Sequence, residues 1–148
     1  MPAEDYVRPR NVTWTKVGNE LIETESKYIN DLPRCHVQST EDRDQLLDEP
    51  FALLILYFKW STLAMLALHA IEHWHDRSWS RFAGLKLYML DGDVCPEVAE
   101  WIAKTLKETG GNGSLFLFKQ GVIASSFPSV IHAGLDRIEN CISEHFHS

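Results

Sequence analysis

The cysteines are the residues best suited to redox or nucleophilic chemistry in this chain, and their spacing argues against most of it. Cys35, Cys95 and Cys141 are widely separated and odd in number, which fits neither a disulfide framework nor a zinc knuckle. Cys95 directly precedes Pro96 at an expected helix start, where a thiolate is favoured. Nothing nearby in sequence supplies a base, so we expect buried, unreactive thiols. A monothiol enzyme that uses Cys95 is the alternative.

Histidines and a serine offer two further kinds of site. His69 and His73 lie one helical turn apart and could share a metal, but His75 points away from them on a regular helix. Ser61 lacks the G-x-S-x-G surroundings of a hydrolase nucleophile and is better explained as a helix cap. The sequence also lacks a P-loop and a G-x-G-x-x-G motif. We therefore expect no metal site and no cofactor.

The elements that must position these residues follow from residue 34 onward. A length of 148 residues, with 45% hydrophobic and 24% charged residues, is typical of one globular domain. Apolar runs and helical stripes alternate, which predicts an α/β fold with parallel strand pairs and a C-terminal hairpin. The expected strands are 34–39, 51–59, 84–91, 114–120 and 122–127. The expected helices are 40–47 with Thr40 as its cap, 61–78, 96–109 and 135–146.

The apolar stretch 51–71 is close to the length that crosses a bilayer. Lys59 lies near its middle, and a central lysine costs roughly 2.5–3.5 kcal/mol on insertion scales. The stretch is therefore interpreted as two elements that meet at Trp60-Ser61, and no membrane insertion is expected. The first of them, 51–59, is apolar throughout, as in a central strand covered on both faces.

The first 33 residues form an extension punctuated by prolines. One stripe of apolar residues within 18–32 predicts a single amphipathic helix. Its members are Leu21, Ile22, Tyr28, Ile29 and Leu32. This helix is expected to dock either on the chain's own domain or on a partner protein.

Charge and the chain start limit the partners and the compartment. The net charge is −7, from 21 acidic and 14 basic residues, which argues against a nucleic-acid partner because phosphate binding needs Lys and Arg. The start has neither a basic nor an apolar region of a secretory signal. We expect a cytoplasmic or other reducing intracellular location.

Three motifs resemble the thioredoxin-like superfamily. Residues 114–121, Ser-Leu-Phe-Leu-Phe-Lys-Gln-Gly, are similar to the family's hairpin segment, and 91–99 to its strand-end Asp followed by a Pro-initiated helix. Phe58-Lys59-Trp60 is similar to the end of its second strand. The resemblance covers 34–148 and implies a thioredoxin-like domain, with a central mixed sheet flanked by helices, after the 1–33 extension.

The chain departs from this family where redox chemistry would occur. In redox-active members a Cys-x-x-Cys pair follows the Trp at a helix start, where the helix dipole stabilises a thiolate. The matching residues are Ser61 and Ala64, which cannot form a disulfide. Gly113 and Ser114 occupy the stretch of the family's cis-proline, and no carboxylate lies within 51–58. The resemblance therefore implies a degenerate, redox-inactive member.

The family's loops after the second strand and before the hairpin form a peptide-contacting surface, which implies a protein partner here. Carried over by position, this surface comprises Trp60, Ser61, Thr62, Asn112, Gly113 and Ser114. We expect a non-enzymatic protein-binding or structural module that also uses its extension. An assembly factor and a subunit of a larger complex, such as a virion or an organellar machine, both fit, and the oligomeric state is left open. The alternative is a monothiol redox enzyme or a glutathione-type ligand binder using Cys95.

Overall fold

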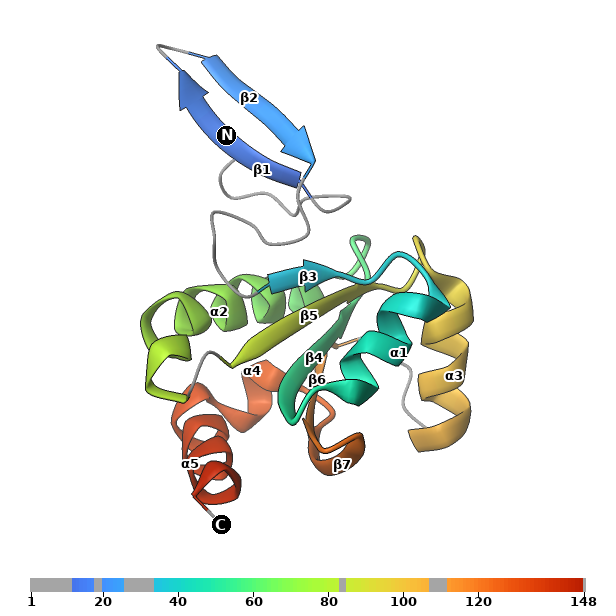
Figure 1. Ribbon diagram of the computed structural model, residues 1–148, viewed down its shortest axis with the longest axis vertical. Coiled ribbons are helices and arrows are strands. Elements are labelled where there is room, and N and C mark those ends of the chain that lie inside the picture. The colour runs from blue at the N-terminus through green and yellow to red at the C-terminus, as the bar shows by residue number, and fades with distance from the viewer. Residues whose placement is uncertain (1–11, 18–19, 26–33, 83–84, 107–111, 148) are drawn as a thin grey trace.

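The core of the protein is a five-stranded mixed sheet with helices on both faces (Figure 1). The computed structural model describes residues 12–17, 20–25, 34–82, 85–106 and 112–147. The strand order is β3-β5-β4-β6-β7; β3 and β4 pair with β5 in parallel, and β4, β6 and β7 pair successively antiparallel. The strands are β3 (Arg34–His36), β4 (Phe51–Tyr57), β5 (Lys86–Asp91), β6 (Ser114–Lys119) and β7 (Val122–Phe127). The predicted mixed sheet is confirmed.

β4 is the central strand, as its apolar sequence predicted. Residues 52–57 are fully buried, and β4 pairs with β5 on one side and β6 on the other. Successive side chains enter two different core clusters, because strand residues alternate between the faces of a sheet. Leu53 and Ile55 pack with residues of α2 (Thr62–Ser78) and α5 (Leu135–Phe146). Leu54 and Leu56 pack with residues of α1 (Thr40–Asp48) and α3 (Pro96–Leu106).

Two short elements complete this part of the chain. The 3-10 helix η3 (Trp79–Phe82) continues α2, and α4 (Val130–Ala133) precedes α5. The sequence did not predict α4. The cap of α1 is also one residue earlier than predicted, because the Ser39 hydroxyl, not Thr40, accepts a hydrogen bond from the Asp42 N–H at 3.3 Å.

The prediction that 51–71 divides into two elements is confirmed. β4 ends at Tyr57, and α2 begins at Thr62. Within the ranges that the structure describes, no helix is both long and apolar enough to cross a bilayer.

The N-terminal extension contains a β-hairpin where the sequence predicted a helix. β1 (Val12–Val17) pairs antiparallel with β2 (Glu20–Glu25) as a sheet of its own, visible at the top of Figure 1. The helix prediction is therefore wrong over 20–25; its remaining residues, 18–19 and 26–32, lie outside the described ones. β1 is rich in Val and Thr, and these β-branched residues favour strands. Segment 20–25 therefore has a neighbouring strand with which its backbone can pair.

A buried arginine attaches the edge strand β3 to α2 and β5. Arg34 is 4% exposed, and its guanidinium donates to His75 Nδ1 at 3.0 Å, to the Glu72 carbonyl and to the Asp76 carboxylate. His75 Nε2 donates in turn to the Leu85 carbonyl at 2.6 Å. Burial lowers the pKa of His75 to about 4, so the ring is neutral at pH 7. His75 thus points into the core, away from exposed His73.

Candidate functional site

Ser61 starts α2 and uses its hydroxyl to do so. Its backbone is extended, and its Oγ accepts a hydrogen bond from the Ala64 N–H at 3.1 Å, which confirms the predicted cap. Ala64 is fully buried. The two positions that matched the family's cysteines therefore carry a capping hydroxyl and a buried methyl group. Neither can exchange a disulfide.

Gly113 brings the loop before β6 directly against the first turns of α2. Its φ is +81°, and a Cβ at this position would lie 2.5 Å from Ala67 Cβ and 3.1 Å from Ala64 Cα. Its carbonyl accepts a hydrogen bond from the Val130 N–H at 3.0 Å. Among the described residues there is no cis peptide bond. The two segments of the predicted surface, 60–62 and 112–114, are thus adjacent, because Gly113 packs directly against α2.

We call the six predicted contact residues, 60–62 and 112–114, the Trp60 edge. Trp60 is 69% exposed, Thr62 and Asn112 are also exposed, and Ser61 is half-buried. Gly113 and Ser114 are buried, and the Ser114 hydroxyl donates to the Pro128 carbonyl at 2.9 Å. These two residues therefore shape the Trp60 edge, while Trp60, Thr62 and Asn112 present side chains to solvent.

Phe58 and Gly92, which the sequence indicated only as parts of family-like motifs, support Trp60. The Phe58 and Trp60 ring centroids are 5.2 Å apart, a distance typical of aromatic packing. The Gly92 N–H donates to the Tyr57 carbonyl at 3.0 Å, which holds the end of β5 against the end of β4. A Cβ on Gly92 would lie 2.2 Å from the Phe58 ring. The missing side chain of Gly92 makes room for the ring on which Trp60 packs.

A buried carboxylate also lies beside this segment. Asp91 ends β5 and is buried; its Oδ2 lies 3.7 Å from Lys59 Nζ, and its Oδ1 accepts from the Asp93 N–H at 3.0 Å. The resemblance implied such a group only within 51–58, where none occurs. Through the contact with Lys59, this carboxylate links the segment that carries Trp60 to the end of β5.

Two further apolar side chains are exposed on elements that meet at the Trp60 edge. Leu66 lies on α2 and Ile131 on α4, and both are exposed. α2 and α4 contact each other, and α4 begins with the Val130 N–H that bonds to Gly113. Leu66 fits the apolar stripe predicted for helix 61–78 and was expected to be covered, but it is exposed, whereas Ile131 lies in α4, which the sequence did not predict. Both add apolar area to the elements around Trp60.

The other candidate chemistries find little support in the geometry. Cys95 is 2% exposed, and burial raises the pKa of its thiol, which is the opposite of what a nucleophilic cysteine needs. Cys35 is buried as well, and Cys141 is half-buried. Within the described ranges, no three His, Cys, Asp or Glu residues are grouped to hold a metal.

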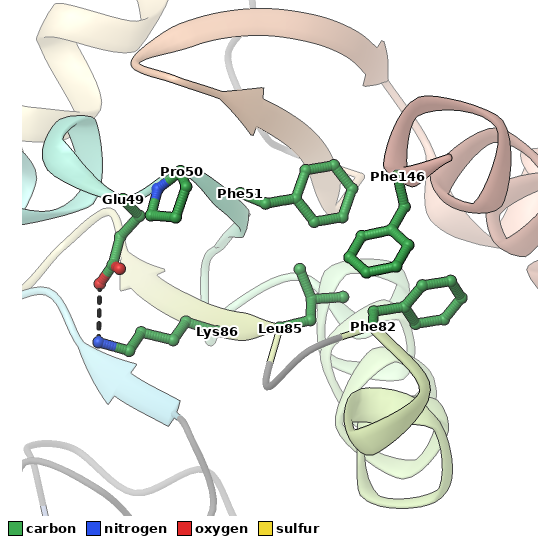
Figure 2. A pocket seen from close by; sticks show the side chains of 7 residues that line it. All are labelled: Glu49, Pro50, Phe51, Phe82, Leu85, Lys86 and Phe146. Atoms are coloured by element: carbon green, nitrogen blue, oxygen red, sulfur yellow. Dashed lines mark ion pairs between the residues drawn. The ribbon is translucent and has the colours of Figure 1, made fainter. Parts of the chain in front are cut away.

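A cavity of about 280 Å³ opens at the amino ends of β4 and β5, the end of the sheet away from Trp60. Figure 2 shows the rings of Phe51, Phe82 and Phe146 gathered on one side and the Glu49–Lys86 ion pair on the other. Glu49 is 3.0 Å from Lys86 and also accepts from the Tyr88 hydroxyl at 2.7 Å. The two charged residues that line the cavity, Glu49 and Lys86, are thus paired with each other. The other lining side chains are apolar.

Comparison with solved structures places this fold among thioredoxins. A Plasmodium falciparum thioredoxin is 13% identical, with 74% of this chain and 97% of that chain covered and a TM-score of 0.56. A Malassezia sympodialis thioredoxin is 13% identical, with 76% and 90% covered and a TM-score of 0.60. A putative oxidoreductase with a thioredoxin fold is 11% identical, with 74% and 93% covered and a TM-score of 0.59.

The sheet order, the capped α2 and these similarities define a thioredoxin-like α/β fold, as the sequence motifs predicted. No family model matches the sequence, and no curated protein matches it. At 11–13% identity the likeness concerns the fold alone.

Proposed function

We propose that this chain is a redox-inactive, non-enzymatic module that binds another protein through the Trp60 edge. The observation that carries the proposal is a tryptophan just before α2 that is 69% exposed while its ring packs on Phe58. Tryptophan is the residue type most enriched at interface hot spots, because a large rigid ring buries much area at little entropic cost. Leu66 on α2 and Ile131 on α4 are further exposed apolar side chains on the helices that border this edge.

The chemistry of the site supports a binding role over a catalytic one. The Ser61 hydroxyl oxygen accepts the hydrogen bond that caps α2, and Ala64 has no reactive group. Cys95 is buried and has a raised pKa, which disfavours a monothiol enzyme or a glutathione-type ligand at that residue. A scaffold with these replacements keeps a surface for recognition.

We include the 1–33 extension in the proposed interface. This arm carries the β1–β2 hairpin as a sheet of its own, apart from the five-stranded sheet, and can add contact area for a partner. Such an arm suits an assembly factor or a permanent subunit of a larger complex, for example a virion or an organellar machine, in a reducing compartment.

Site-specific photocrosslinking tests the proposal. A benzophenone amino acid at exposed Thr62 is expected to give a light-dependent adduct with one or a few proteins in extracts of the native source. The matched control is Val122, which is 67% exposed at the start of β7 and outside the Trp60 edge. Equal labelling from positions 62 and 122, or no adduct from 62, contradicts the proposal.

A further inference from the structure

A second cavity, of about 260 Å³, lies where β7, α4 and α5 meet. Ser126 and Phe127 come from the end of β7, Ser129 and His132 from the start and middle of α4, and Arg137 from the first turns of α5. Pro128 completes the wall between the strand and α4. Three separate elements therefore contribute side chains to one small hollow.

The polar residues lining this cavity are hydrogen-bond donors, and none of its lining residues is an acid. Within the part of the chain that the structure describes, Arg137 forms no ion pair, and the Ser126 hydroxyl has no hydrogen-bond partner. The Ser129 Oγ accepts from the His132 N–H at 3.4 Å, which leaves the hydroxyl hydrogen available to donate. A cluster of donors that includes a guanidinium without an ion pair favours an anion locally, even though the chain as a whole carries a net charge of −7.

The other wall of the cavity is apolar. Phe127 is buried beneath it, and Pro128 flanks it. A bare anion would leave this wall in contact with water, whereas an anion joined to a small organic group would cover it. Among anions, a phosphate offers three terminal acceptor oxygens to donors from different directions, and a carboxylate offers only two.

We propose that this cavity binds a small phosphate monoester, with Arg137, Ser126 and Ser129 donating to the phosphate and Phe127 and Pro128 contacting the organic group. The site is separate from the proposed function at the Trp60 edge. The two are nevertheless neighbours in the fold, because the Ser114 hydroxyl bonds to the Pro128 carbonyl and the Val130 N–H bonds to the Gly113 carbonyl.

NMR titration of the full chain with phenyl phosphate tests the site. The amide signals of 126–137 are expected to shift in a saturable way. Inorganic phosphate and benzoate are the comparison ligands, and each is expected to bind at least about fivefold more weakly, since each lacks either the organic group or the third oxygen. No saturable shift with phenyl phosphate, or equal affinity for all three ligands, overturns the proposal.

Arg137→Gln and Arg77→Gln separate a defined site from general electrostatic attraction. Both arginines are exposed, but Arg77 lies on α2 and does not line the cavity. Arg137→Gln is expected to weaken phenyl phosphate binding about tenfold or more, and Arg77→Gln by less than twofold. Equal losses in both variants contradict a site at Arg137. Trp60→Ala is expected to leave phenyl phosphate affinity unchanged, so the site and the Trp60 edge are tested independently.

Discussion

Cys95 illustrates how burial decides the chemistry of a single residue. It lies directly before α3, and a helix N-terminus stabilises an anion by about 0.3–1 kcal/mol at an exposed position. Its side chain is only 2% exposed, however, and desolvation is the largest influence on its thiol, so the pKa is raised. The sequence motif alone indicates a position that favours a thiolate, but burial in the core removes this advantage.

The three cysteines should therefore differ in reactivity. In the native protein we expect a thiol reagent such as iodoacetamide to modify half-buried Cys141 first and to leave Cys35 and Cys95 protected until the chain unfolds. Peptide mass spectrometry over a time course measures the order. Labelling in denaturant, where all three should react alike, is the control. Faster labelling of Cys95 than of Cys141 in the native protein would revive the monothiol alternative.

At the scale of elements, the contact between the ends of β4 and β5 positions Trp60. Gly92→Ala should strain this contact, because its Cβ would lie 2.2 Å from the Phe58 ring. Overpacking of this kind typically destabilises a protein by about 1–3 kcal/mol, which denaturant unfolding measures. Trp60 fluorescence should change as well.

Phe58→Leu provides the matched background for this test. Leucine removes the ring that meets the added methyl, so Gly92→Ala should cost less stability in Phe58→Leu than in the wild type. An equal cost in both backgrounds would show that the Phe58 ring is not the reason for a glycine at 92.

The hydrogen-bonded group of Arg34 and His75 joins β3, α2 and β5, and it makes stability depend on pH. Burial lowers the pKa of His75 to about 4, against 6.5 in an unfolded chain. Between these values the unfolded state binds more protons, so stability is complete above pH 6.5 and falls toward pH 4. The full loss from this residue is about 3 kcal/mol.

Urea unfolding at pH 7 and pH 4.5 measures this dependence. His75→Gln should be less stable than the wild type at pH 7 and should lose less stability on acidification. His73→Gln removes an exposed histidine from the same helix and should behave like the wild type. A pH dependence unchanged by His75→Gln would refute the assignment.

Elements with a continuous signal were predictable from the sequence, and contacts between distant residues were not. The apolar run of β4 and the cap at Ser61 are determined by residues that are adjacent in the sequence. The helix prediction for the extension failed because Leu21 and Ile22 fit a helical stripe as well as a strand. Their pairing with the Val- and Thr-rich strand β1 is a contact between separate segments that the stripe does not reveal. The resemblance assigned Trp60 to a contact surface, but its support by Phe58 and Gly92 depends on how β4 and β5 end side by side.

For the whole molecule, we expect the fold from Arg34 onward to account for most of the stability and propose the extension as part of the interface. The buried contacts of Arg34 and both core clusters lie within 34–147. Deletion of residues 1–33 should therefore change the melting temperature by only a few degrees while weakening partner binding. Calorimetry and a binding titration with the crosslinked partner measure the two effects. Undiminished partner affinity would exclude the extension from the interface.

The most direct test of the central claim measures the affinity of the partner crosslinked at position 62 for three variants of the full chain. Trp60→Ala should weaken binding by about thirtyfold, the effect of losing a hot-spot residue, while Val122→Ala should stay within about twofold. A variant with Cys35, Cys95 and Cys141 all replaced by alanine should keep the affinity of the wild type. Binding that survives Trp60→Ala but disappears without the cysteines would contradict a redox-inactive binding module.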